Sequence, residues 1–426
     1  MTTQGVRGAL ENVFSAEAAR IVSSIVRVTG DWELAEDCLQ DAFIRALASW
    51  EQQGVPANPG AWLTTVARNR AVDHIRRSVV ERRALGHVAY EAQVEDLEQE
   101  STLPDRDERD DRLSLIFTCA HPALSMDARV ALTLRTVAGL SVESIARSFL
   151  TTESTMTKRL VRARAKIKDA GIPYRVPPPE LLAERASGVL SVLYLVFNEG
   201  YASTERGLIV DGGLQVEAIR LARLLVGVAG DAPFRSEAES LLALMLLQGS
   251  RNESRVTAGG RLVPLEEQDR SRWDRVAIAE AVGILNELTA GLAAGGGEPG
   301  PYFLQASIAA QYAVAESMVA TDFARIAELY RELMVLTPSP VIELNHAVVV
   351  AMAEGPAAGL ALVEELDSRG ALEGYYLLSA ARADLLRRLG RHSESSAHYS
   401  RALAIAPSPQ ERDYLAARIA AINAQA

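Results

Sequence analysis

The sequence predicts an all-α protein of more than one domain. Its 426 residues exceed what one ordinary hydrophobic core accommodates, so two or three domains are expected. Aromatic residues make up only 5% of the chain, and apolar residues recur with helical spacing along almost its whole length. Composition and periodicity therefore agree on helices as the main element.

Charge is distributed unevenly along the chain, which is acidic overall with a net charge of −11. Residues 1–84 are balanced, and residues 85–111 carry ten acidic groups against two basic ones. Residues 112–178 reverse the sign, with eleven basic groups against four acidic ones, and residues 179–426 return to a net −10. The overall acidity argues against general nucleic-acid binding, but one central block is basic.

The first 84 residues predict three helices. Two amphipathic helices are expected over 9–50, and Asp31 is a plausible N-cap for the second, which spans 32–50. The inward face of that second helix is expected to hold Leu34, Ala35, Cys38, Leu39, Ala42, Phe43, Ala46 and Leu47. After a Gly/Pro/Asn loop at 51–60, Asn58 suits an N-cap and Pro59 the first helical position. That third helix is expected to reach about residue 83 and becomes rich in arginine from residue 68.

A basic two-helix unit lies in the centre of the chain. The polar, acidic residues 85–111 predict a flexible linker, and helical spacing returns over 112–170. Ser141 is expected to cap one short helix, and Thr151 or Thr152 the next. The second short helix is expected to bury Met156, Leu160, Ala163 and Ile167 and to turn its basic side chains outward. A short helix with one dry and one basic face after a tight turn is typical of a helix-turn-helix, which docks in the DNA major groove.

The C-terminal part from residue 180 predicts a helical array. Prolines 173 and 177–179 mark a boundary before it, because consecutive prolines do not continue a helix. The string YRELMVLTPSP at 330–340 matches YSRALAIAPSP at 399–409, an offset of 69 residues, and Gly355 and Gly390 are 35 apart. These spacings are close to two periods and one period of a tetratricopeptide (TPR) repeat of about 34 residues. No repeat is visible over 180–320.

Three strings in the first 178 residues resemble an extracytoplasmic-function (group 4) RNA polymerase sigma factor. They are AEDCLQDAF at 35–43, PGAWLTTVARNRAVDHIRR at 59–77 and SVESIARSFLTTESTMTKRLVRAR at 141–164. The remainder resembles the long TPR-like C-terminal extension that one subgroup of these factors carries. The resemblance implies sigma region 2 at 1–84, the acidic linker at 85–111, sigma region 4 at 112–175 and the extension at 180–426.

The resemblance also implies which residues act. The helix around 35–43 is expected to bind core RNA polymerase through Asp37, Gln40, Asp41 and Phe43. Recognition of the melted −10 element is assigned to Trp62, Asn69, Arg70, Asp73, Arg76 and Arg77. Recognition of the −35 element is assigned to Thr155, Lys158, Arg159, Arg162, Arg164 and Lys166. A solvated helix face remains the alternative for the 35–43 helix, and a core residue remains the alternative for Trp62.

The leading interpretation is a sigma factor that opens promoters together with core polymerase. Its activity is expected to be controlled in cis by the extension, through contact with the sigma domains or through a regulatory protein bound to the TPR-like surface. The alternative is a helix-turn-helix regulator with a TPR partner-binding domain that acts without polymerase. An enzyme is not expected, since no nucleophile–base pair, phosphate loop or metal-ligand spacing is present in the sequence, and no cofactor or metal is implied.

The cysteines and the apolar runs predict the compartment. Cys38 and Cys119 are expected to be buried free thiols. The sequence shows no signal peptide, and its longest apolar run is far shorter than the roughly 20 residues of a membrane span. We therefore expect a soluble, cytoplasmic protein that does not bind membranes.

Overall fold

The computed structural model describes residues 18, 21–26, 29, 31–83, 108–137, 139–149, 151–205, 213–255, 257, 263–407 and 409–423. Within these ranges every regular element is a helix, which confirms the all-α prediction. The chain divides into two compact units. Unit 1 comprises Met1–Val196 and Gly227–Phe234, and unit 2 comprises Phe197–Val226 and Arg235–Ala426. Most of the predicted linker lies outside the described residues, and its last four residues begin a helix.

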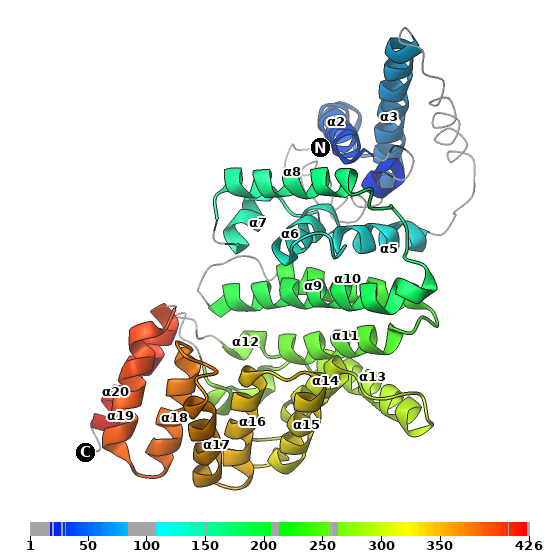
Figure 1. Ribbon diagram of the computed structural model, residues 1–426. Coiled ribbons are helices and arrows are strands. Elements are labelled where there is room, and N and C mark those ends of the chain that lie inside the picture. The colour runs from blue at the N-terminus through cyan, green and yellow to red at the C-terminus, as the bar shows by residue number, and fades with distance from the viewer. Residues whose placement is uncertain are drawn as a thin grey trace. The chain divides into compact units, whose positions relative to one another are not determined.

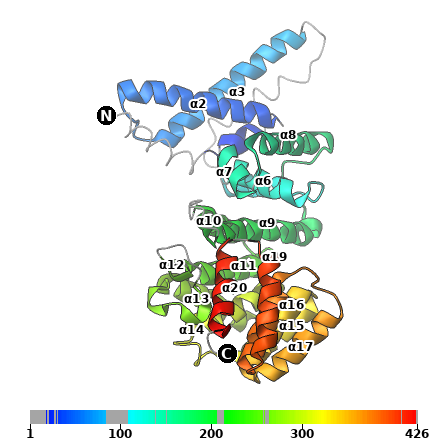
Figure 2. The ribbon, with the colours of Figure 1, turned by 90° about the vertical axis from the view of Figure 1, so that its left-hand side faces the viewer.

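Unit 1 begins with a packed pair of helices, α2 (Trp32–Gln53) and α3 (Pro59–Arg83), seen together in Figure 2. The predicted caps are confirmed. The Asp31 carboxylate accepts a hydrogen bond from the Leu34 N–H at 3.1 Å, and the Asn58 side chain accepts one from the Ala61 N–H at 3.1 Å. Each cap satisfies an N–H group that has no partner inside its own helix.

The contact between α2 and α3 is built on two tryptophans. Trp50 is 1% exposed and meets the half-buried Trp62 edge-to-face, with ring centroids 5.5 Å apart. Most of the predicted inward face of α2 is buried, but Leu47 is 38% exposed, and Leu34 and Phe43 are half-buried. Placing Leu47 inside was therefore wrong, because α2 turns that position away from α3.

Four further helices of unit 1 form the predicted helix-turn-helix and its support. They are α5 (Glu108–Cys119), α6 (Met126–Thr136), α7 (Val142–Ser148) and α8 (Glu153–Asp169). Ser141 accepts from the Ser144 N–H at 3.1 Å, and Thr152 accepts from the Thr155 N–H at 3.2 Å. The apolar face of α8 is buried as predicted, against α6 and α7.

Unit 1 does not end at the predicted boundary near residue 178. Helix α9 (Pro179–Glu205) begins there, but its first two-thirds belong to unit 1. Arg185 donates to the Phe117 carbonyl at 3.2 Å, and the Phe117 ring meets Phe234 edge-to-face at 6.2 Å. Residues beyond the boundary therefore complete the hydrophobic core under the helix-turn-helix.

The first helices of unit 2 include one strongly buried helix, α11. They are α10 (Gly213–Ala229), α11 (Arg235–Gly249), α12 (Asn252–Arg255), η1 (Leu265–Glu267), η2 (Arg270–Arg272), α13 (Arg275–Ala293) and α14 (Pro301–Val314). Helix α11 packs on both α13 and α14. Its Glu237 caps α14 by accepting from the Tyr302 N–H at 3.2 Å. Burial raises the pKa of Glu237, and the N–H groups of Tyr302 and Phe303 oppose that rise.

Six helices complete unit 2, standing in sequence beside one another (Figure 1). They are α15 (Phe323–Leu336), α16 (Pro340–Ala353), α17 (Pro356–Ser368), α18 (Tyr376–Arg388), α19 (His392–Ile405) and α20 (Pro409–Asn423). The two matching strings, 330–340 and 399–409, each end at the first residue of a helix: Pro340 begins α16 and Pro409 begins α20. Gly355 and Gly390 adopt positive φ values of 106° and 75°, a conformation that glycine adopts without strain. The 69-residue repeat is thus a repeat of helix pairs.

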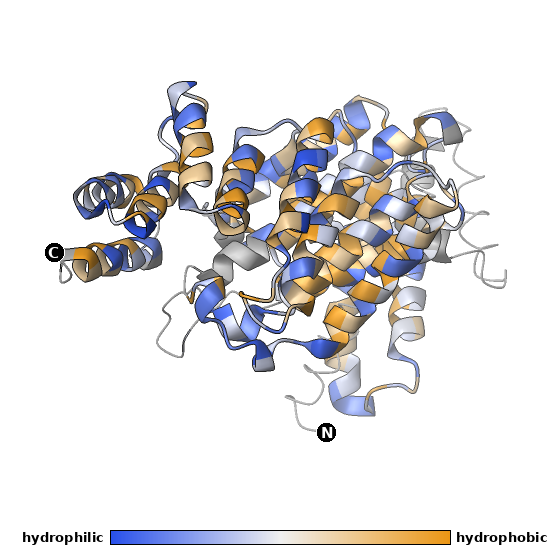
Figure 3. Ribbon diagram, turned by 90° about the horizontal axis from the view of Figure 1, so that it is seen from below, coloured by the Kyte–Doolittle hydropathy of each residue, from blue (hydrophilic) through white to orange (hydrophobic). Residues whose placement is uncertain are grey.

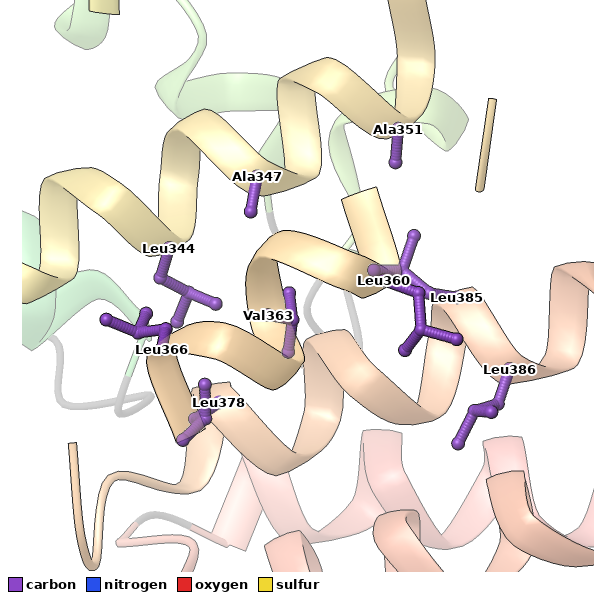
Figure 4. Close-up of a cluster of buried hydrophobic side chains, with 9 residues drawn as sticks. All are labelled: Leu344, Ala347, Ala351, Leu360, Val363, Leu366, Leu378, Leu385 and Leu386. Atoms are coloured by element: carbon purple, nitrogen blue, oxygen red, sulfur yellow. The ribbon is translucent and has the colours of Figure 1, made fainter. Parts of the chain in front are cut away.

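Each helix of this array has an apolar face. Figure 3 shows apolar and polar segments alternating along the helices. In Figure 4 the apolar side chains of α16, α17 and α18 point toward one another. The cluster consists of Leu344, Ala347, Ala351, Leu360, Val363, Leu366, Leu378, Leu385 and Leu386. Gly359 allows α16 and α17 to approach closely, because a Cβ there would lie 2.4 Å from the Ala351 Cβ.

Among the described helices, α13 is the one long and apolar enough to cross a membrane by length and composition. Core helices of soluble proteins can be equally long and apolar. In unit 2, α13 packs against α11 and α14.

Candidate nucleic-acid interface

The outward face of α8 carries the basic side chains predicted for DNA recognition. Thr155, Lys158, Arg162 and Lys166 are all exposed, and their spacing of three to four residues places them on one side of the helix. Thr155 also shares a hydrogen bond of 2.8 Å with the cap residue Thr152. Three cations on one exposed face fit contacts with phosphates and guanine edges in a major groove.

Two other predicted residues of α8 are held by acidic partners instead. Arg159 is half-buried, lies 3.3 Å from the Asp127 carboxylate and stacks over the Phe149 ring at 5.3 Å. Arg164 forms an ion pair with Glu36 of α2. In this structure both arginines fasten α8 to its surroundings, and neither belongs to the exposed face.

The exposed face of α3 gathers four of the residues predicted for the −10 element. Asn69, Asp73 and Arg76 are exposed and follow the half-buried Trp62 along one side of the helix. An aromatic ring beside polar and basic groups suits stacking on an unpaired base. The side chain of Arg77 lies outside the described residues.

Asp41 and Arg70, predicted for two different partners, meet each other. The Arg70 Nε lies 2.6 Å from an Asp41 carboxylate oxygen, and both side chains are about one-third exposed. This ion pair joins α2 to α3, so the faces predicted for polymerase and for −10 DNA belong to one helix pair.

The outer face of α2 extends beyond the predicted residues. Asp37 and Gln40 are exposed, whereas Asp41 and Phe43 are half-buried. Ile44, 64% exposed, and Leu47 continue the stripe begun by Asp37 and Gln40, at helical spacing. Sequence reasoning missed this apolar half, although counting four residues onward from Gln40 leads to Ile44, and three more lead to Leu47. Exposed apolar side chains beside polar ones are typical of a protein interface.

The two cysteines do not form a reactive site. Both are buried free thiols, as predicted. Burial raises the pKa of Cys38 to about 12 and raises that of Cys119 as well, so both remain protonated and unreactive near neutral pH. Within the described residues, no group of His, Cys, Asp and Glu side chains is placed to hold a metal ion.

Comparison with known proteins assigns these faces to domains. Sigma-70 region 2 matches residues 13–80, and Sigma-70, region 4 matches residues 114–167. The ECF RNA polymerase sigma factor SigL of Mycobacterium tuberculosis is 32% identical over 165 residues, which cover 38% of this chain and 89% of SigL. The chain belongs to the ECF RNA polymerase sigma factors. It is therefore a sigma factor for transcription initiation. Sigma factor families are non-enzymatic transcription regulators.

One relative of the sigma factor matches most of the chain and therefore most of its C-terminal part. An uncharacterized protein of Rhizobium meliloti is 42% identical over 398 residues, covering 92% of this chain and 91% of that protein. A family of unknown function, DUF6596, matches residues 185–289, which begin in unit 1 and end in unit 2. The probable ECF sigma factor SigI of M. tuberculosis is 27% identical over 47% of this chain and 72% of its own length. No solved structure matches the chain.

Proposed function

We propose that this sigma factor reads the −35 element with α8 and the −10 element with α3, while α2 holds core RNA polymerase. The observation that carries the proposal is the separation of three exposed faces, each of distinct chemistry. The face of α8 is basic, that of α3 combines aromatic, amide and charged groups, and that of α2 is acidic and apolar.

Promoter-directed transcription tests the α8 face. Core enzyme is expected to give a run-off product from the promoter upstream of the gene's own operon only when the sigma factor is added. The double substitution Lys158→Ala/Arg162→Ala should lower this product by about tenfold or more, because a lost base contact costs about 1–3 kcal/mol. Lys168→Ala removes the same charge from an exposed site off this face and should leave most of the product.

Two outcomes would contradict this assignment. Equal losses from Lys158→Ala/Arg162→Ala and from Lys168→Ala would show that the α8 face contributes only general positive charge. DNA binding at full strength without core enzyme, together with no run-off product, would favour a helix-turn-helix regulator that acts alone.

The α2 stripe predicts a separate loss of polymerase binding. Ile44→Asp is expected to weaken the affinity for core enzyme about tenfold or more, because it places a charge in an apolar contact. The fold should persist, since Ile44 is mostly exposed. Gln52→Asp adds the same charge at an exposed site away from the stripe and is the matched control in a fluorescence binding titration. Equal affinity of the Ile44→Asp variant and the parent would remove Ile44 from the interface.

Control in cis by the extension is part of the proposal. Supporting it, Arg185 and Phe234 pack on Phe117 of region 4, and residues 179–426 carry a net charge of −10 against +7 for residues 112–178. The helix pairs of α15–α20 are TPR-like and offer a surface for a regulatory protein.

The compartment follows from the partner, because core polymerase and promoter DNA are in the bacterial cytoplasm.

A further inference from the structure

A groove in unit 2 lies between the N-terminal halves of α10 and α13. Its volume is about 460 Å³, and the end of α11 and the start of α12 also line it. All of its lining residues fall between 215 and 280, inside the segment matched by the family of unknown function. The groove therefore belongs neither to the two sigma regions nor to the TPR-like helices α15–α20.

Two side-chain amides meet in this groove. The Asn252 Nδ2 donates a hydrogen bond to the Gln215 Oε1, and Gln215 is only 3% exposed. The Gln215 Nε2 and the Asn252 Oδ1 are both buried and have no hydrogen-bond partner among the described residues. Exchanging nitrogen and oxygen in both amides together gives the same result. The pair therefore leaves one donor and one acceptor unsatisfied in the groove.

The amide pair is held in place by the chain around it. The Trp273 indole N–H donates to the Ser254 Oγ at 2.8 Å, and the Asp274 N–H donates to the Ser250 carbonyl at 2.9 Å. These bonds tie α12 and the residues before it to the start of α13, and Asn252 is the first residue of α12. A buried polar atom without a partner is destabilising, and in an open groove a ligand can supply the partner.

The charges along the groove are balanced. Arg220 donates to Glu217 at 2.8 Å, and Arg223 forms an ion pair of 2.8 Å with Glu280, which joins α10 to α13. The Asp274 carboxylate caps α13. The four charged lining residues, two basic and two acidic, thus sum to zero, and each already has a partner. This arrangement suits an uncharged ligand better than an anion or a cation.

The helices on both sides of the groove present apolar side chains. Val216 of α10 is 68% exposed, and Val276 of α13 is 78% exposed. The lining residues of α10 run from Gln215 to Arg223, which is about 12 Å along a helix. An extended chain covers that length with three to four residues, at about 3.3 Å each.

An extended peptide matches both the amide pair and the apolar sides. Each residue of such a chain points its own N–H and C=O to the same side, while successive side chains point in opposite directions. One residue can therefore accept from the Gln215 Nε2 and donate to the Asn252 Oδ1. Its neighbours then direct their side chains toward α10 and α13, where Val216 and Val276 lie. Main-chain hydrogen bonds combined with apolar side-chain contacts are a recurring way to recognise peptides.

We propose that this groove binds a short, uncharged segment of extended peptide with aliphatic side chains. Gln215 and Asn252 read the backbone of the segment, and Val216 and Val276 contact its side chains. The C-terminal extension thereby takes up a partner protein through a segment of that partner's chain. The proposal goes beyond the proposed function, and its test needs neither polymerase nor DNA.

A blocked tripeptide tests the groove in the full-length protein. The probe is acetyl-Val-Ala-Val-N-methylamide, added to protein labelled with ¹³C in its valine methyl groups. The methyl signals of Val216 and Val276 should shift, with a dissociation constant of about 1 mM or tighter. Val216→Ile and Val276→Ile each remove the signals of one valine and so assign them.

A depsipeptide is the matched control for the backbone contact. It carries lactate in place of the central alanine, so that an ester oxygen replaces one N–H group and the shape is kept. It should bind about tenfold more weakly than the peptide, because it leaves the Asn252 Oδ1 unpaired.

Substitutions separate binding from folding. Gln215→Leu/Asn252→Leu removes both amides and keeps their volume, so the thermal midpoint should stay equal or rise while the probe binds at least about tenfold more weakly. Val276→Asp places a charge in the apolar side and should also weaken binding about tenfold or more. Val319→Asp adds the same charge at a position that is 97% exposed and outside the groove, and should leave the affinity unchanged.

The peptide site is overturned if the signals of Val216 and Val276 do not shift with the probe. Equal affinities for the peptide and the depsipeptide would also overturn it. Full-strength binding to Gln215→Leu/Asn252→Leu would show that apolar burial alone holds the probe, which contradicts backbone recognition. If that variant does not fold, the comparison of peptide with depsipeptide on the parent protein still decides.

Discussion

Phe234→Ala is expected to destabilise region 4 by about 3–5 kcal/mol, although the residue lies far beyond the matched sigma domain. Phe234 is 5% exposed and packs edge-to-face on Phe117, which is 1% exposed. Phe234 also lines a cavity of about 390 Å³ together with Leu113, Ser114, Val176, Leu182, Ala229 and Ala232. Removing the ring enlarges a space that the surrounding helices already leave open, so the loss of packing is not recovered.

Hydrogen exchange in the full-length protein measures this effect. Amides of α5 and α8 should exchange faster in Phe234→Ala, and −35-dependent transcription should fall with them. Phe234→Leu keeps most of the apolar volume and should retain most of the protection. Unchanged exchange in α5 and α8 would show that region 4 folds without the residues beyond 178. The substitution is more informative than truncation at 178, which removes Arg185, Phe234 and the whole extension together.

Trp50→Ala is the second change with a large expected effect, about 3–5 kcal/mol on region 2. Trp50 is among the largest fully buried side chains, and its ring fixes Trp62 and the crossing of α2 and α3. Its indole nitrogen is buried with no hydrogen-bond partner among the described residues, so Trp50→Phe loses volume but no hydrogen bond. Urea unfolding followed by circular dichroism should rank the parent, Trp50→Phe and Trp50→Ala in that order of stability.

Trp62→Ala is the control that separates stability from DNA contact at this site. Trp62 is half-buried, so its removal should cost less stability than the removal of Trp50. Promoter opening should nevertheless fall, since stacking on a base is worth about 1–3 kcal/mol. If Trp62→Ala destabilises region 2 as much as Trp50→Ala and opens promoters normally, Trp62 is a core residue alone.

Local sequence signals predicted the helices well because each depends on neighbouring residues. Asp31, Asn58, Ser141 and Thr152 cap the helices they were expected to cap, each through a hydrogen bond to a residue three positions later. The buried face of α8 followed from its spacing alone.

Partner choice among charged residues was not predictable in this way. Arg159 and Arg164 share the helix and residue types of the exposed cations, yet Asp127 holds one and Glu36 the other. Asp41 and Arg70 were assigned to different macromolecules, and in this structure they also bind each other. A charged side chain carries no sequence signal for a partner that only packing brings near.

The sequence by itself determined the sigma-factor character, the helical repeat and the basic face of α8, because periodicity, capping and motif spacing are local properties. Only the tertiary structure decided where the core of region 4 ends and which arginines remain exposed. Phe234 and Phe117 are far apart in the chain, as are Glu36 and Arg164. Their contacts arise from the packing of whole helices, and no window of sequence contains both partners.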